Sequence, residues 1–161
     1  MKESELANQL SDLQHLIRQL GPSLPEISTI IEEDLDEWQI IFDSGLSLKI
    51  SWQETPARVL LYCAIGKPDE SQREKIFARL LTMNLLLQGV ANLKLALSSP
   101  EDDVIVIGEI ESTALTLEIL QAEISDYLRF AAHFSELINK TDIENEEEDS
   151  SHVMNLDLLR A

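Results

Sequence analysis

Residues 76–87 read IFARLLTMNLLL. Written as a helix, this stretch carries a first apolar stripe, because four positions recur at helical spacing: Ile76, Leu80, Met83 and Leu87. Four further apolar residues widen the stripe far beyond one face: Phe77, Leu81, Leu85 and Leu86. A helix that is apolar nearly all round must be covered on more than one side, and a second copy of the chain is the simplest second cover. The stretch therefore predicts a helix that packs on another protein, although a fully buried helix of a monomer is the competing interpretation.

The segments on either side of this helix predict an α+β domain. A helix is expected over residues 4–20, where Gly21-Pro22 follows as a stop signal. Residues 23–37 fit either a strand or a short helical turn. Alternating or continuous apolar residues predict strands at 38–43, 46–52, 58–65, 92–98 and 103–110, and helices at about 71–88 and 113–139. The order is α-β-β-β-α-β-β-α, with a twisted, mostly antiparallel sheet and dimerisation through the region of the middle helix.

The end of the sequence differs in composition from the rest. Residues 143–151 read IENEEEDSS, a run of like charge that favours disorder, and a short apolar segment with Val153, Leu156, Leu158 and Leu159 follows it. We therefore predict one domain over residues 1–140 and a flexible acidic tail over residues 141–161.

Composition excludes several classes of function. The chain has 161 residues and a formal net charge of −18, which repels nucleic-acid phosphates and anionic membrane surfaces. The single cysteine, Cys63, permits no disulfide within the chain and suits a reducing cytoplasm. Neither a signal peptide nor a membrane-spanning run is evident, so no membrane insertion is expected.

No pattern of catalytic or metal-binding residues stands out. The three histidines, His15, His133 and His152, have no partner at a metal-ligand spacing. Cys63 lies in the middle of an apolar strand with no basic neighbour that would lower its pKa. The sequence therefore predicts no cofactor, no metal and no enzymatic activity. An enzyme would instead require a deep polar pocket that groups His133 or Cys63 with carboxylates.

Several segments resemble the class I chaperones of bacterial type III secretion, the CesT/SycE-like family, over residues 4–139. The similarity rests on the order of elements, on an apolar strand that enters the turn Ile65-Gly66-Lys67-Pro68, and on a Leu-Leu-x-x-Asn helix at residues 80–84. Small size and low pI are also typical of that family. The acidic extension after Lys140 goes beyond the family pattern.

The resemblance implies a homodimer of the bacterial cytoplasm that binds the N-terminal segment of a secreted effector in extended form and keeps it soluble for export. It implies no nucleotide hydrolysis, and the secretion-system ATPase is a further candidate partner. A regulatory protein of the same fold, which sequesters a transcription regulator or its inhibitor, is the alternative.

Candidate contact residues follow from the apolar surplus. The expected dimer interface comprises Ile76, Leu80, Met83, Asn84 and Leu87. The strand at 58–65 is apolar on both faces, so its second face is a candidate surface for the extended partner, together with neighbouring strands. The expected effector-binding residues are Ile41, Leu60, Tyr62, Ile105 and Ile107. The competing interpretation is that helices of the same subunit cover these side chains.

Overall fold

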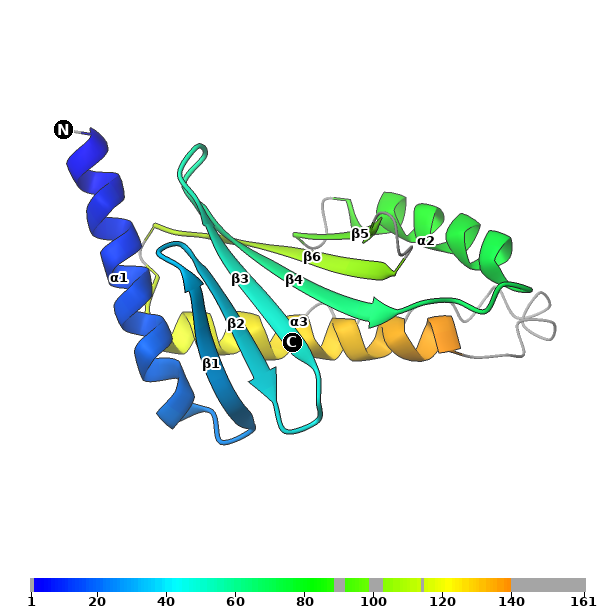
Figure 1. The fold of residues 1–161 in the computed structure, drawn as a ribbon. Coiled ribbons are helices and arrows are strands. Elements are labelled where there is room, and N and C mark those ends of the chain that lie inside the picture. The colour runs from blue at the N-terminus through cyan, green and yellow to red at the C-terminus, as the bar shows by residue number, and fades with distance from the viewer. Residues whose placement is uncertain (1, 89–91, 99–102, 114, 140–161) are drawn as a thin grey trace.

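The structure is a computed structural model that describes residues 2–88, 92–98, 103–113 and 115–139 (Figure 1). The described residues form the helices α1 (Lys2–Ser23), α2 (Arg73–Leu87) and α3 (Leu117–Asn139). The strands are β1 (Ile27–Asp34), β2 (Glu37–Phe42), β3 (Ser47–Gln53), β4 (Arg58–Gly66), β5 (Leu93–Leu97) and β6 (Val104–Glu111). The predicted α+β class and the order of the elements are confirmed, with one strand added.

The six strands form one antiparallel sheet in the order β1-β2-β3-β4-β6-β5. The added strand, β1, occupies the region that fits either a strand or a short turn by sequence. Only Ile27 and Ile30 of β1 are even half-buried, and the acidic residues that follow are exposed. A strand at the sheet edge needs few buried residues, so its apolar pattern is short and weak.

One face of the sheet forms the hydrophobic core. Along β2, β3, β4 and β6, alternate residues point to this covered face, where α1 and α3 pack (Figure 1). The largest side chains there are fully buried: Leu13, Ile17, Leu20, Ile40, Leu48, Ile50, Leu61, Leu120 and Ile124. Burial of each such side chain contributes about 1.5–3 kcal/mol, so this face supplies most of the stabilisation of the domain.

Helix α3 crosses β6 at a position where the sheet lacks a side chain. The Tyr127 hydroxyl donates a hydrogen bond of 2.6 Å to the backbone carbonyl of Val106. A Cβ at Gly108 would lie only 2.7 Å from Cδ2 of the Tyr127 ring. Glycine at position 108 therefore lets the tyrosine ring lie directly against the strand.

Helix α2 lies along the outer edge of β5 (Figure 1). The Asn84 side chain donates to the Leu95 carbonyl at 2.9 Å and accepts from the Leu95 N–H at 2.7 Å. Both backbone groups would otherwise be unpaired at a strand edge, so Asn84 takes the place of a neighbouring strand. The asparagine of the Leu-Leu-x-x-Asn stretch thus fastens α2 to the sheet.

Some predicted boundaries differ from the structure. Helix α1 continues through Gly21-Pro22 to Ser23, because proline in the last turn removes only one hydrogen bond at the end of the helix. The loop expected at 99–102 and the acidic tail expected at 141–161 lie outside the described residues.

Candidate functional site

The second face of the sheet is not covered by a described helix, and we call it the open face. The strand registers align four of its residues in one row across the sheet, in the order Lys49, Tyr62, Ile107 and Lys94. A neighbouring row includes Ala64, Ile105 and Ala96. Aliphatic and aromatic side chains thus occupy the centre of a face that no described helix packs against.

All five residues predicted to bind an effector lie on the open face, and each is half-buried: Ile41, Leu60, Tyr62, Ile105 and Ile107. Tyr62, Ile105 and Ile107 are neighbours across β4 and β6, and Ile41 lies two strands away on β2. The structure therefore places these residues on one surface. Their role in binding a partner stays a prediction.

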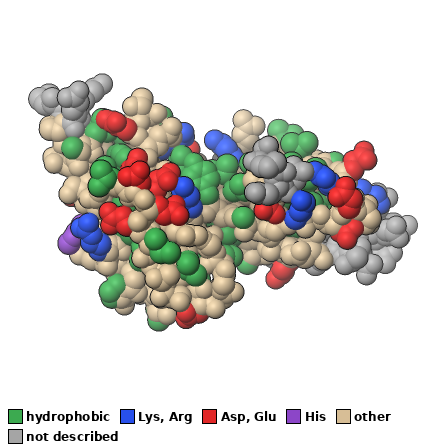
Figure 2. Space-filling view, viewed as in Figure 1, with side chains coloured by type: hydrophobic (Ala, Val, Ile, Leu, Met, Phe, Trp, Pro, Cys, Tyr) green, Lys and Arg blue, Asp and Glu red, His purple; other side chains and the backbone are tan. Residues whose placement is uncertain are grey.

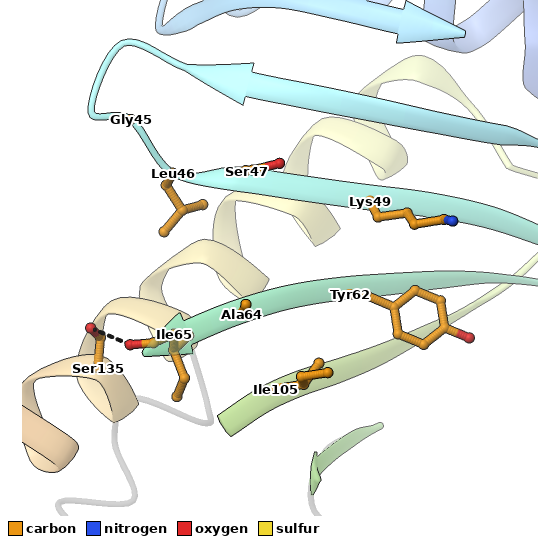
Figure 3. A pocket seen from close by; sticks show the side chains of 9 residues that line it. All are labelled: Gly45, Leu46, Ser47, Lys49, Tyr62, Ala64, Ile65, Ile105 and Ser135. Atoms are coloured by element: carbon orange, nitrogen blue, oxygen red, sulfur yellow. Dashed lines mark hydrogen bonds between the residues drawn. The ribbon is translucent and has the colours of Figure 1, made fainter. Parts of the chain in front are cut away.

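A hollow of about 450 Å³ opens at one end of this face (Figure 3). Pairing between β3 and β4 stops at Lys49 and Tyr62, and beyond that point the two strands separate. Helix α3 closes the gap from behind, where the Ser135 hydroxyl donates to the Ile65 carbonyl at 3.0 Å. Of the predicted residues, Tyr62 and Ile105 line the hollow; its other lining residues are Gly45, Leu46, Ser47, Lys49, Ala64, Ile65 and Ser135.

Ion pairs border the apolar centre of the open face. The Lys49 ammonium lies 2.8 Å from Glu37 and 3.6 Å from Glu33, and the hydrogen bond to Glu37 raises the pKa of Lys49. Near the other end of β4, the Arg58 guanidinium lies 2.7 Å from Glu109. Figure 2 shows hydrophobic side chains over the middle of the sheet and acidic side chains near the turn between β1 and β2. The face thus offers an apolar strip with charged borders.

The dimer interface expected on α2 involves residues that lie mostly in the core of the single chain. Three of its five residues, Ile76, Leu80 and Leu87, are at most 5% exposed, because they pack into the core of their own chain. Asn84 is bound to Leu95, and Met83 packs against the same core. The three residues in the core are therefore not accessible to a second copy.

The opposite side of α2 is exposed instead. Leu81 and Leu85 are each 70% exposed, and Leu86 is 48% exposed. Figure 2 shows hydrophobic side chains on this outward side of α2. We call these three residues the leucine face. The helix thus has apolar residues on two sides, and the position of a dimer interface on it stays a prediction.

The candidate catalytic residues are dispersed. Cys63 is buried on the covered face, His15 accepts or donates a hydrogen bond with Gln19, and His133 lies edge-on to Phe134. Neither Cys63 nor His133 lines the hollow. Within the described ranges, no group of three or more histidine, cysteine or acidic residues is arranged to hold a metal ion.

None of the helices described here is long and apolar enough to span a bilayer.

Cys63 gives the stability of the protein a dependence on alkaline pH. Burial raises the pKa of its thiol from 9.0 to about 11. Above pH 9 the unfolded chain loses this proton while the folded chain keeps it, so the free energy of unfolding should fall as the pH rises to 11. The loss attributable to Cys63 is about 3 kcal/mol at most. Urea titrations at pH 8 to 11 should show this slope in the natural chain and a shallower one in Cys63→Ala; equal slopes would contradict the assignment.

Comparison with known proteins agrees with this architecture. The sequence profile of the Tir chaperone protein (CesT) family matches residues 38–135. The chain belongs to this family. The resemblance predicted from the sequence is thereby confirmed, and the match spans β2 to the last turns of α3. A search of curated protein sequences finds no match.

Solved structures share the fold of this CesT-family protein. The HopA1–SchA chaperone–effector complex contains a chain with a TM-score of 0.62 and 19% identity, covering 77% of this chain and 93% of that chain. The ExsC–ExsE complex gives a TM-score of 0.59 at 21% identity, with coverage of 84% and 94%. The Yersinia pestis type III secretion chaperone SycH, in complex with a fragment of YscM2, gives 0.56 at 12% identity, with coverage of 74% and 97%.

Sequence reasoning missed three features of this CesT-family protein. The leucine face was visible as apolar residues, but the sequence alone did not decide which stripe faced the core. The hollow depends on where two strands separate, which has no sequence signal. Lys49 borders it because of the register between β3 and β4, and that register appears only in the folded sheet.

Proposed function

We propose that this chain is a homodimeric chaperone of the bacterial cytoplasm, which binds the N-terminal segment of a type III secretion effector in extended form. The observation that supports this proposal best is the open face. It carries five half-buried apolar residues and a hollow, all accessible from one side of the sheet. Exposed apolar surface of this kind is typical of protein-binding sites.

An extended partner fits the geometry of the open face better than a folded one. In an extended chain alternate side chains point to the same side and repeat every 6–7 Å, so several can reach a flat sheet at once. The hollow beside Tyr62 and Ile105 has room for an apolar side chain of such a segment. The edge strand β1 offers backbone groups for strand addition, whereas Asn84 already occupies the centre of the β5 edge.

The leucine face supports the proposed homodimer. Three large aliphatic side chains lie together on the outer side of α2, where they are 48–70% exposed and none of the described elements covers them. Burial of three leucines from each subunit would contribute of the order of 10 kcal/mol before the cost of association is subtracted.

The proposal assigns binding and no catalysis to the chain. The buried thiol of Cys63 has a raised pKa, which disfavours the nucleophilic thiolate. The open face presents aliphatic residues, one tyrosine and paired charges, a set that suits recognition by contact and not bond cleavage. A regulatory protein that sequesters a transcription regulator would use the same face, and the identity of the partner separates the two functions.

The experiment begins with the partner. The tagged chain is purified from its native cytoplasm and the bound protein is identified by mass spectrometry. An exported protein supports the proposed function, and a DNA-binding regulator or its inhibitor supports the alternative. The N-terminal fragment of the identified protein then serves as the ligand for affinity measurements.

Replacing Tyr62 and Ile107 with glutamate should weaken binding of that fragment by about 10- to 100-fold, because two carboxylates would be desolvated against an apolar segment. Isothermal titration calorimetry measures the change. Ile119→Glu is the matched control: this side chain is also exposed, at 44%, but lies on α3. Unchanged affinity in the double variant, with an unchanged melting temperature, would refute the role of the open face.

A further inference from the structure

We infer that the C-terminal apolar segment of this chain, residues 153–159, docks on its own open face and competes there with the partner. The inference rests on the proposed function, because it concerns the same surface. Three observations carry it: where α3 ends, the side-chain pattern of the segment, and the exposed lysine at the β5 end of the face.

Helix α3 ends beside the hollow. Ser135 lines the hollow and is bonded to Ile65, and the last described residue of the helix, Asn139, follows four positions later. The helix extends to Asn139, whose side-chain amide donates to the Ser135 carbonyl at 2.9 Å. The chain therefore continues from a place within about one helical turn of the open face.

The length of the chain beyond α3 is sufficient. Residues 140–152 separate Asn139 from the apolar segment. Thirteen residues span up to about 40 Å when extended, more than the roughly 27 Å length of an eight-residue strand such as β6. The segment can thus reach any part of the open face without strain.

The middle of the segment, residues 154–158, has the pattern of an extended chain with one apolar side. Met154, Leu156 and Leu158 alternate with Asn155 and Asp157. In an extended conformation the first three side chains would point to one side, about 7 Å apart. Ile105 and Ile107 are two positions apart on β6, so their side chains have the same spacing, and a segment laid along β6 can contact both, in the way proposed for an external partner.

A lysine at the border of the open face can orient the segment. In a chain of net charge −18, the central row of the open face carries a lysine at each end, Lys49 and Lys94. Lys94 is exposed. The segment contains Asp157 and follows the acidic run that ends at Asp149. Lys49 is already paired with Glu37 and Glu33, so Lys94 is the lysine of this row that can reach these carboxylates while the apolar residues fill the centre of the strip.

Tethering makes weak docking effective. A segment held on a short linker has an effective concentration in the millimolar range, so even a weak contact is populated. A partner must then displace the segment. The apparent affinity of the partner is its intrinsic affinity multiplied by the fraction of chains whose face is free. Release of the segment should therefore tighten partner binding by about five- to tenfold.

The test uses the full chain labelled at isoleucine methyl groups. In the variant Leu156→Glu with Leu158→Glu, the NMR signals of Ile105 and Ile107 should shift relative to the natural chain. A synthetic peptide of residues 150–161, added to this variant, should return them saturably towards their natural positions. The control, Ser150→Glu with Ser151→Glu, adds the same charge outside the apolar pattern and should leave both signals in place.

Three results would overturn the inference: identical Ile105 and Ile107 signals in the natural chain and the variant, a peptide that shifts only signals elsewhere, or shifts that grow with protein concentration. The last result would assign the segment to the face of a second copy. The methyl signals are measured without an external partner, so they decide the docking of the segment by themselves. Failure to capture an exported protein would refute the proposed function and leave this result unaffected.

Discussion

Replacing both Leu81 and Leu85 with glutamate is expected to convert the proposed dimer into a folded monomer. Each side chain is 70% exposed in the single chain, so the substitution removes little from the core of the protomer. In the proposed dimer the same carboxylates would be buried against leucines of the partner copy without a counter-charge. The dissociation constant should rise at least 100-fold, which corresponds to about 3 kcal/mol.

Sedimentation velocity at several protein concentrations, combined with a thermal melt, measures this effect. Leu80→Glu is the informative contrast, because Leu80 is only 5% exposed and packs into the core of its own chain. This second variant should lose cooperative melting, whereas the first should keep it. A double variant that sediments as the natural chain does would show that the leucine face is not the dimer interface.

The contrast between Leu80 and Leu81 marks the limit of what the sequence could predict about α2. Helical periodicity identified two apolar stripes, and both exist in the structure. The pattern could not show which stripe faces the core, because Leu80 and Leu81 are chemically identical and differ only in the direction in which they point. Asn84 decides the direction: its carboxamide must reach Leu95, and this turns Ile76, Leu80 and Leu87 towards the core.

The open face could be predicted more fully, because a strand has only two sides. In the strand at 58–65, Val59, Leu61 and Cys63 are matched by the apolar Leu60 and Tyr62, so a second apolar face was evident from alternation alone. The sequence of edge strand β1 fits a strand or a turn equally, because its isoleucines do not alternate; a register shift between Ile27 and Thr29 disrupts the period of two. Local pattern therefore predicts the interior strands of this sheet better than its edge.

The contact between Gly108 and Tyr127 could not be foreseen, since it joins a glycine in an ordinary strand pattern to a tyrosine on a distant helix. Its energetic consequence is large. Gly108→Ala would place a methyl group 2.7 Å from Cδ2 and 2.9 Å from Cε2 of the ring. The ring cannot move away freely, because its hydroxyl is bonded to the Val106 carbonyl at 2.6 Å. Overpacking of this kind costs about 2–3 kcal/mol.

The expected result for Gly108→Ala is a melting temperature lower by about 5–10 °C, since 1 kcal/mol corresponds to roughly 2–4 °C in a domain of this size. A double-mutant cycle with Tyr127→Leu separates the clash from the general effect of alanine in a strand. In the Tyr127→Leu background, where no ring lies over position 108, the same alanine should cost less than about 1 kcal/mol. Equal costs in both backgrounds would show that the clash is relieved by movement of the helix as a whole, and that α3 is not held at this distance by Tyr127.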